Sequence, residues 1–211
     1  MFITFEGPEG SGKSTQAQAL HRHLVETGLA VVLTREPGGT ALGDSLRRLL
    51  MDAVDVPIDP RAETLLFAAA RAQLVAEVIA PALAAGKVVI CDRYSDSTIA
   101  YQAYGRGLEP HAVRRVVDFA TGGLQPDLSV LLDLPPEDGL KRKKAEPVDR
   151  FERETLDFHR RVREGYLSLA GQSPERWLVV DGTLPERSAF ALICTRVEAL
   201  LGRRGRTTGV A

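Results

Sequence analysis

The sequence predicts an α/β fold in which helices cover an open, parallel β-sheet. Five short apolar runs have the length of strands: Phe2–Glu6, Val31–Thr34, Lys87–Cys91, Leu128–Asp133 and Trp177–Asp181. Most of them are continuously apolar rather than alternating, which is typical of parallel strands that helices cover on both faces. Helical stretches separate the runs, so we expect right-handed crossovers. A length of 211 residues fits one hydrophobic core, so we expect a single domain over residues 1–211.

The helices are predicted from start and stop signals. Asp59 and Pro60 form a typical helix beginning, and Gly86 a typical ending. Pro81 is expected to bend or shorten that helix, because proline has no N–H group to donate. The predicted helices are Lys13–Thr27, Asp59–Ala85, Asp96–Tyr104, Pro110–Thr121, Pro136–Lys144, Phe151–Ala170 and Pro185–Leu201. The remaining tail, residues 202–211, has little to bury and is expected to be disordered.

Composition and charge argue against several classes of protein. Lys and Arg total 27 and Asp and Glu total 28, so the chain has no net positive field to attract nucleic acid. No apolar run approaches the ~20 residues that span a membrane, and the N-terminus does not have the pattern of a secretory signal. The two cysteines, Cys91 and Cys194, are interpreted as buried thiols. We therefore expect a cytoplasmic protein that binds neither nucleic acid nor a membrane.

One motif points directly to chemistry. The segment Gly7-Pro8-Glu9-Gly10-Ser11-Gly12-Lys13-Ser14 matches G-x-x-x-x-G-K-[ST] and lies between the first predicted strand and the first predicted helix, as this motif requires. Its glycines let backbone N–H groups turn towards phosphate oxygens, and the helix N-terminus adds positive potential. Lys13 is expected to bridge the β- and γ-phosphates of ATP, and the Ser14 hydroxyl to bind Mg²⁺. The sequence thus predicts a P-loop NTPase fold.

The motif predicts a bound nucleotide but leaves the reaction open between a GTPase switch, an ATP-driven mechanical protein and a small-molecule kinase. A GTPase usually carries an Asn-Lys-x-Asp element, which this sequence lacks. After the strand Lys87–Cys91, Asp92 is a candidate ligand for Mg²⁺, and Arg93 follows it directly. An arginine beside that acid suggests a second phosphate to be held, which favours a kinase with a phosphorylated acceptor. A non-catalytic ATP-dependent switch is the alternative from another class.

Several segments, in order along the chain, resemble those of thymidylate kinases. Asp92–Gln102 resembles their Asp-Arg-Tyr/His signature, Thr34–Thr40 the Arg-Glu-Pro-Gly-Gly element of bacterial members, Leu66–Arg71 the base-binding helix, and Gln125–Asp133 the approach to the fourth strand. The resemblance implies a nucleoside monophosphate kinase-like fold with a five-stranded sheet, usually in a homodimer. It implies transfer of the γ-phosphoryl group of ATP to dTMP, giving dTDP and ADP, with Mg²⁺ as cofactor. Another nucleoside monophosphate kinase is the alternative within the class.

The base of the acceptor is expected to lie against two side chains that share one face of a helix. Phe67 and Arg71 are four residues apart, so the ring can stack on a pyrimidine while the guanidinium donates to a ring carbonyl. Core packing for Phe67 and a surface salt bridge for Arg71 are the alternatives. Hydroxyl and amide groups after the strand end are expected to read the polar edge of thymine, from Ser97, Thr98, Tyr101 and Gln102. By resemblance, Tyr101 also lies against the sugar, where a ribose 2′-OH would sit.

Arginines are the candidate clamps for the acceptor phosphate, because a guanidinium makes bidentate, charge-assisted bonds to phosphate oxygens. The candidates are Arg35, Arg47 and Arg93, of which Arg47 could equally be solvated. Glu9 lies inside the phosphate-binding motif, where a carboxylate is repulsive unless it has another task. The resemblance suggests that Glu9 accepts a bond from the acceptor sugar hydroxyl or from a magnesium-bound water. Asp92 is expected to hold Mg²⁺ through water.

Charge on the transferring phosphoryl group must be neutralised, yet the x positions of the motif carry no basic side chain. In one class of the resembled family, arginines come instead from a mobile lid, and residues 139–153 lie in the corresponding place. Arg142 and Arg150 are the lid candidates, with a position of Arg150 near adenine as an alternative. Lys143 and Lys144 stand where a second lid arginine would be expected, and a solvated basic loop is the other interpretation. The candidate catalytic residues are Lys13, Arg93, Arg142 and Arg150.

Overall fold

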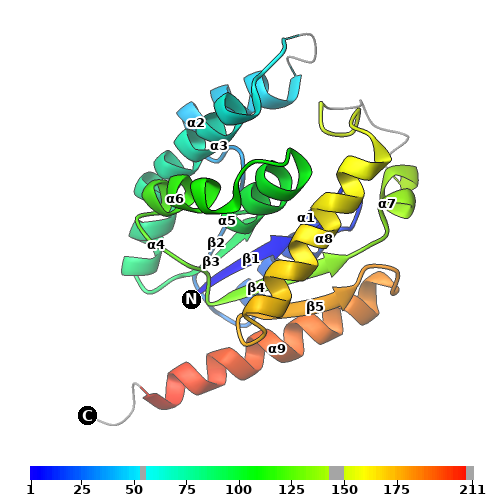
Figure 1. Ribbon diagram of the computed structural model, residues 1–211. Helices are drawn as coiled ribbons and strands as arrows, with labels where there is room; N and C mark the ends of the chain where they lie inside the picture. Colours follow the sequence, from blue (N-terminus) through cyan, green and yellow to red (C-terminus); the bar gives the residue numbers. More distant parts are fainter. Residues whose placement is uncertain (53–55, 143–149, 208–211) are drawn as a thin grey trace.

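The computed structural model describes residues 1–52, 56–142 and 150–207 and contains the expected open, parallel sheet (Figure 1). Its strands lie in the order β2-β3-β1-β4-β5, and every neighbouring pair is parallel. Their bounds are β1 Phe2–Glu6, β2 Val31–Arg35, β3 Val88–Asp92, β4 Leu128–Asp133 and β5 Trp177–Asp181. The five predicted strands are therefore confirmed, each to within one residue at either end.

Helices cover both faces of this sheet (Figure 1). The α-helices are α1 Lys13–Glu26, α2 Ala41–Arg47, α3 Pro60–Leu74, α4 Ala80–Ala84, α5 Ser95–Thr98, α6 Pro110–Thr121, α7 Pro136–Arg142, α8 Leu156–Gln172 and α9 Glu186–Thr207. π-Helical turns continue three of them, at Arg48–Asp52 (η1, after α2), Val75–Ile79 (η2, after α3) and Ile99–Gly105 (η3, after α5). Helices α1 and α9 pack together against the sheet, and α8 packs against η3.

One helix beginning differs from the prediction and one helix was not predicted, and a threonine side chain caps each of them. The helix predicted from Phe151 begins at Leu156, because the Thr155 side chain caps it by accepting the Phe158 N–H. Helix α2 was not predicted at all, although Thr40 caps it by accepting the Gly43 N–H at 3.0 Å. A threonine before a short helix is a weak signal by itself, since the same residue type also begins turns.

The long predicted helix Asp59–Ala85 and the chain end differ as well. The π-helical turn η2 interrupts the long helix just before Pro81, which cannot donate the backbone hydrogen bond that an α-helix needs there. Helix α9 continues to Thr207, into the segment that was expected to be disordered. Residues 208–211, and the last two residues of the predicted helix Pro136–Lys144, lie outside the described residues.

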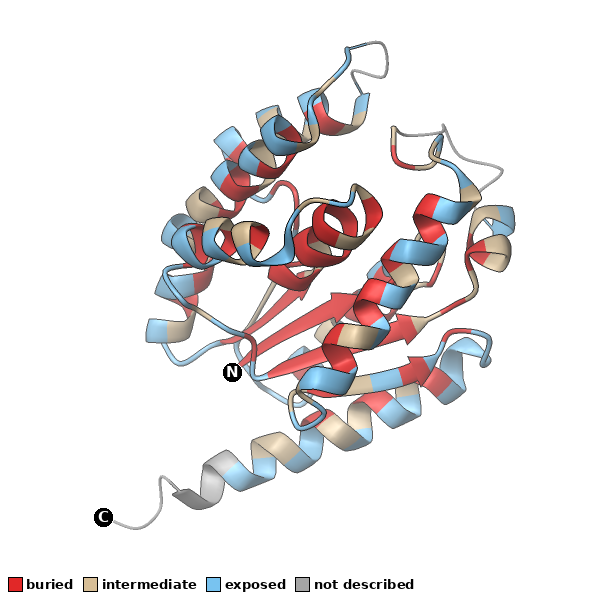
Figure 2. Cartoon of the chain, in the orientation of Figure 1, coloured by how far each residue is buried: buried red, intermediate tan, exposed pale blue. Residues whose placement is uncertain are grey.

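The hydrophobic core lies on both faces of the central strands (Figure 2). Every residue of β1 is buried, and successive side chains point to opposite faces. Ile3 and Phe5 pack in the cluster that also contains Leu20 of α1, whereas Phe2 packs in the cluster that contains Leu74 of α3. The sheet is thus held from both sides, which leaves the loops at the carboxyl ends of its strands to form a site.

One described segment, the helical stretch Pro60–Ala84, is long and apolar enough to span a membrane by length and composition alone. The same stretch carries the buried side chains of Glu63 and Arg71, and both form ion pairs with other segments of this chain. That pattern is typical of a core helix, in which buried charges are paired.

Candidate active site

A cavity of about 530 Å³ lies beside the carboxyl ends of β1, β2 and β3. The P-loop forms one wall, and the segments after β2 and β3 together with α3 form the others. Most of the predicted site residues line it: Glu9, Gly10, Gly12, Lys13, Ser14, Arg35, Arg47, Phe67, Arg71, Asp92, Arg93, Ser97, Thr98, Tyr101 and Arg142. The structure thus brings together residues that lie between positions 9 and 142 of the sequence.

The P-loop owes its shape to three glycines. Gly7, Gly10 and Gly12 have φ values of 142°, 68° and 92°, a region that side chains disfavour. A Cβ atom on Gly10 would also lie 2.2 Å from the carbonyl oxygen of Gly139. The Lys13 ammonium lies across this loop and donates to the Pro8 carbonyl at 2.7 Å. Backbone and lysine therefore face the same small volume, as a phosphate cradle requires.

Ser14 and Asp92 meet at the carboxyl end of β3, where the Ser14 hydroxyl donates to Asp92 Oδ2 at 2.5 Å. Mg²⁺ prefers oxygen ligands and usually keeps several waters, with one or two protein groups and phosphate oxygens completing the set. A hydroxyl and a carboxylate fit that chemistry. Among the described residues no cluster of three or more His, Cys, Asp or Glu side chains could hold a metal by itself.

Arg93 and Glu9 form an ion pair between the end of β3 and the P-loop. The Tyr101 hydroxyl donates to the same Glu9 oxygen at 2.7 Å, and the Arg93 guanidinium lies 5.0 Å from the centre of the Tyr101 ring. Burial raises the pKa of the Tyr101 phenol well above its usual value, so the hydroxyl stays protonated and able to donate. Glu9 therefore joins the P-loop to the segment that follows β3.

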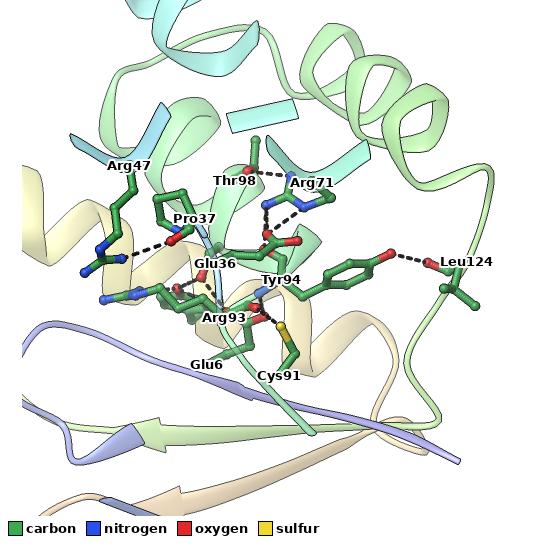
Figure 3. Close-up of polar contacts among 12 residues, drawn as sticks. Glu6, Glu36, Pro37, Arg47, Arg71, Cys91, Arg93, Tyr94, Thr98 and Leu124 are labelled. Atoms are coloured by element: carbon green, nitrogen blue, oxygen red, sulfur yellow. Dashed lines mark hydrogen bonds and ion pairs between the residues drawn. The ribbon is translucent and has the colours of Figure 1, made fainter. Parts of the chain in front are cut away.

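Arg71 forms a salt bridge, but a buried one rather than the surface pair considered from the sequence (Figure 3). Its side chain is 1% exposed, and Nε and Nη2 donate to Glu36 Oε2 at 2.8 and 2.5 Å. Nη1 donates to Thr98 Oγ1 at 2.9 Å, and Nη2 donates to the Tyr94 carbonyl at 3.0 Å. Burial raises the pKa of the Glu36 carboxyl, and the charge of Arg71 opposes that rise. Arg71 is thus fixed before any ligand contacts it.

Glu36 and Phe151 were not predicted, although both line the cavity. Glu36 lies inside the Arg-Glu-Pro-Gly-Gly element, so an acidic residue between an arginine and a proline was the signal available. The Phe151 ring lies 5.9 Å from Phe67 and 5.5 Å from Tyr101, centre to centre. These aromatic rings give the cavity an apolar wall on which a flat base can pack. No sequence pattern placed Phe151 there.

Five predicted site residues do not line the cavity: Gly7, Pro8 and Ser11 of the P-loop, and Gln102 and Arg150. The Gln102 amide donates to Glu63 Oε1 at 2.9 Å, and Arg150 forms an ion pair with Oε2 of the same carboxylate. Glu63 is 0% exposed and also pairs with Arg106. The roles of Gln102 and Arg150 towards substrates therefore stay predictions.

The remaining predicted arginines lie at the rim. Arg142 lines the cavity and donates to the Gly182 carbonyl at 3.2 Å, and Arg47 donates to the Pro37 carbonyl at 3.1 Å. Arg35 also lines an adjoining cavity of about 430 Å³. The predicted lid residues 143–149, including both lysines, lie outside the described residues.

Comparisons with known proteins agree on one family. The family model "Thymidylate kinase" matches residues 5–193. The chain is 51% identical to the thymidylate kinase of Geotalea uraniireducens, with 95% of this chain and 97% of the relative covered. It is 57% identical to that of Synechococcus sp., with 90% and 98% covered. The crystal structure of the Ehrlichia chaffeensis thymidylate kinase superimposes with a TM-score of 0.78 at 35% identity, covering 94% of this chain and 98% of the other. The chain belongs to the thymidylate kinase family.

Proposed function

We propose that this chain transfers the γ-phosphoryl group of ATP to dTMP, giving dTDP and ADP, and that residues 1–211 act as one kinase domain. Family membership supports the reaction. The observation that carries the assignment of residues is the shared cavity in which P-loop residues face Arg71 and Arg93. A non-catalytic switch would not need a cavity that extends past its nucleotide to a group of arginines.

On the donor side, the P-loop backbone and Lys13 bind the triphosphate, because loop N–H groups and the ammonium converge on one volume. Ser14 and Asp92 are the residues that would hold Mg²⁺, which when bound neutralises charge on the β- and γ-phosphate oxygens. An acceptor phosphate oxygen attacks the γ-phosphorus in line as the bond to the ADP oxygen breaks. No covalent enzyme intermediate is needed, so the protein acts by positioning and by charge.

On the acceptor side, the aromatic wall of Phe67 packs on the thymine and Arg71 donates to a ring carbonyl, supported by the fixed position of its guanidinium. Thr98 and Ser97 offer hydroxyl groups in the same cavity. Tyr101 lies against the sugar. Gln102 reads the base only if its amide turns from Glu63.

The acceptor phosphate is bound by the guanidinium groups of Arg93, Arg35 and Arg47, which all line the cavity. Glu9 is already the acceptor for Arg93 and Tyr101, and we assign it the additional bond from the sugar hydroxyl or a magnesium-bound water. A carboxylate in the P-loop is tolerable because the adjacent guanidinium compensates its charge.

Arg142 is the lid residue that we assign to the transferring phosphoryl group. It lines the cavity, and its Nη1 lies 3.5 Å from the Gly10 carbonyl oxygen of the P-loop. Arg150 can take this role only by leaving its buried ion pair with Glu63. An arginine that is already beside the P-loop needs less rearrangement.

We also infer that the chain forms a homodimer and works in the cytoplasm. Large apolar side chains are exposed on neighbouring helices, with Phe119 of α6 93% exposed and Leu65 of α3 59% exposed. Exposed apolar surface of this kind favours contact with another chain. Light scattering after size exclusion tests the dimer, with Phe119→Asp expected to weaken it, and cell fractionation tests the location.

Coupled ADP release from ATP tests the reaction itself. We expect rapid ADP release with dTMP and little without it. A panel of dTMP, dUMP, dCMP, dGMP and AMP at equal concentration tests the acceptor. Preference for another monophosphate would assign a different nucleoside monophosphate kinase activity. ADP release that no monophosphate stimulates would overturn the kinase assignment in favour of a switch.

A further inference from the structure

Arg93 has an unusual backbone for a residue with a side chain. Its φ is 69°, in the left-handed region, and among the described residues no other non-glycine has a positive φ. This conformation is disfavoured because Cβ approaches the following carbonyl oxygen. Such residues persist only where the surroundings hold them by several contacts, and they cluster at functional sites. The contacts that hold Arg93 therefore decide where its guanidinium lies.

The peptide groups on both sides of Arg93 are fixed by neighbouring strands. Its own N–H donates to the Phe5 carbonyl at 2.9 Å, which continues the pairing of β3 with β1. The next N–H, that of Tyr94, donates to Oε1 of Glu6 at 2.9 Å. Glu6 is 0% exposed and does not line the cavity, although it lies next to the Arg93–Tyr94 segment (Figure 3).

The guanidinium is linked to the same carboxyl group. Arg93 Nη1 donates to the Tyr166 hydroxyl oxygen at 3.2 Å, and that oxygen lies 2.7 Å from Ser97 Oγ. The Ser97 hydroxyl in turn donates to Oε2 of Glu6 at 2.6 Å. One oxygen of Glu6 thus holds the backbone beside Arg93, and the other holds the hydroxyl groups behind its side chain.

We propose that Glu6 is a positioning residue that holds Arg93 in its left-handed conformation and so sets the affinity for the acceptor phosphate. The proposal rests on the proposed role of Arg93 in binding dTMP. Glu6 acts only through Tyr94, Ser97 and Tyr166, and it touches neither substrate. Removing the Glu6 carboxylate should therefore weaken dTMP binding and leave ATP binding unchanged.

The test compares Glu6→Met with Glu6→Gln by titration calorimetry and steady-state kinetics. Methionine has similar length but offers no carboxyl oxygen to the Tyr94 N–H, whereas glutamine keeps one carbonyl acceptor. For Glu6→Met we expect the Kd and KM for dTMP to rise about tenfold, with ATP values within about twofold. This is the effect of leaving the Tyr94 N–H unsatisfied, since the Ser97 hydroxyl can still donate to Tyr166. Glu6→Gln should restore dTMP affinity to within about threefold of wild type.

Thr4→Val is the matched control, because Thr4 is also buried in β1 and its hydroxyl donates to Ser129, away from Arg93. It should lower stability without changing the dTMP constants. A rise equal to that of Glu6→Met would overturn the proposal, as would unchanged dTMP constants in folded Glu6→Met. If Glu6→Met does not fold, Tyr166→Phe takes its place with an expected rise of about threefold, and no change there overturns the proposal. A wild type that binds no dTMP would instead refute the proposed function.

Discussion

The two sides of the cavity are built in different ways. The phosphate cradle of the donor side is one continuous segment, residues 7–14, formed by a glycine-rich backbone and a single lysine. The acceptor side is assembled from separate segments that buried ion pairs hold together, above all Arg71 with Glu36 and Arg93 with Glu9. A backbone cradle depends on local conformation, whereas a pocket of paired charges depends on the whole fold. Substitutions should therefore be selective on the donor side and should affect both binding and stability on the acceptor side.

The largest expected effect is on the donor side. Lys13→Ala should lower kcat on the order of 10³-fold or more, because the charge that develops on the phosphoryl group loses a fixed partner. The Kd for dTMP should stay within about twofold, since the acceptor pocket comes from other segments. Rapid-quench kinetics and calorimetry measure the two quantities. Lys87→Ala, which removes an exposed lysine just before β3, is the control and should behave as wild type. Equal loss of ATP and dTMP binding in a folded Lys13→Ala would contradict the separation of the two sides.

Substitution of Arg142 or Arg150 should have the next largest effect on kcat. At least one of Arg142→Ala and Arg150→Ala should lower kcat by about 10³-fold with little change in dTMP KM, as arginine-finger losses do. We expect the larger loss for Arg142, because it lines the cavity while Arg150 pairs with Glu63. Steady-state kinetics on both variants decides the order. Near-normal kcat in both would leave Arg93 or a second subunit as the source of the charge.

Arg71→Ala should disturb the acceptor side in two measurable ways. The KM for dTMP should rise about tenfold or more, because a ring carbonyl loses its charged donor. Stability should fall by roughly 3–5 kcal/mol, because Glu36 is left buried without its partner.

The double variant Arg71→Ala/Glu36→Gln separates these two effects. It removes the unpaired charge, so stability measured by urea unfolding should recover in part while the KM for dTMP stays high. A KM that recovers together with stability would show that Arg71 supports the pocket only through folding.

The smallest effect is a pH dependence of stability on the acceptor side. Burial raises the pKa of Glu6 to about 8, helped by the charges of Asp96 and Glu36 and opposed by Ser97 and Arg93. Between the usual pKa of a glutamate and about 8, the unfolded chain releases this proton while the folded chain keeps it. Stability should therefore fall as pH rises, by about 2 kcal/mol from pH 6 to 8. Urea unfolding across this range should show a shallower fall for Glu6→Gln, and parallel curves would contradict the shifted pKa.

Local signals explain why the strands and the P-loop could be predicted. Apolar runs define β1 to β5, and the G-x-x-x-x-G-K-S spacing is readable because its function lies in consecutive residues. Helix beginnings were harder, since caps such as Thr155 and Thr40 are single residues that also suit turns. Resemblance supplied the roles of Arg71 and Tyr101, which no periodicity distinguishes from core or surface positions, whereas Arg93 was indicated by its place directly after Asp92.

By itself, the sequence determined the parallel α/β fold, the phosphate cradle and the family of this chain, because each depends on a pattern along a continuous stretch. Only the tertiary structure decided the partners of the charged side chains. It pairs Arg71 with Glu36, joins Arg93 to Glu9 and attaches Gln102 and Arg150 to Glu63. Those pairs join residues that are 35 to 87 positions apart. A buried charge is costly unless it is paired, so its partner is the opposite charge that the packed core brings near. Local sequence does not show which residue that is.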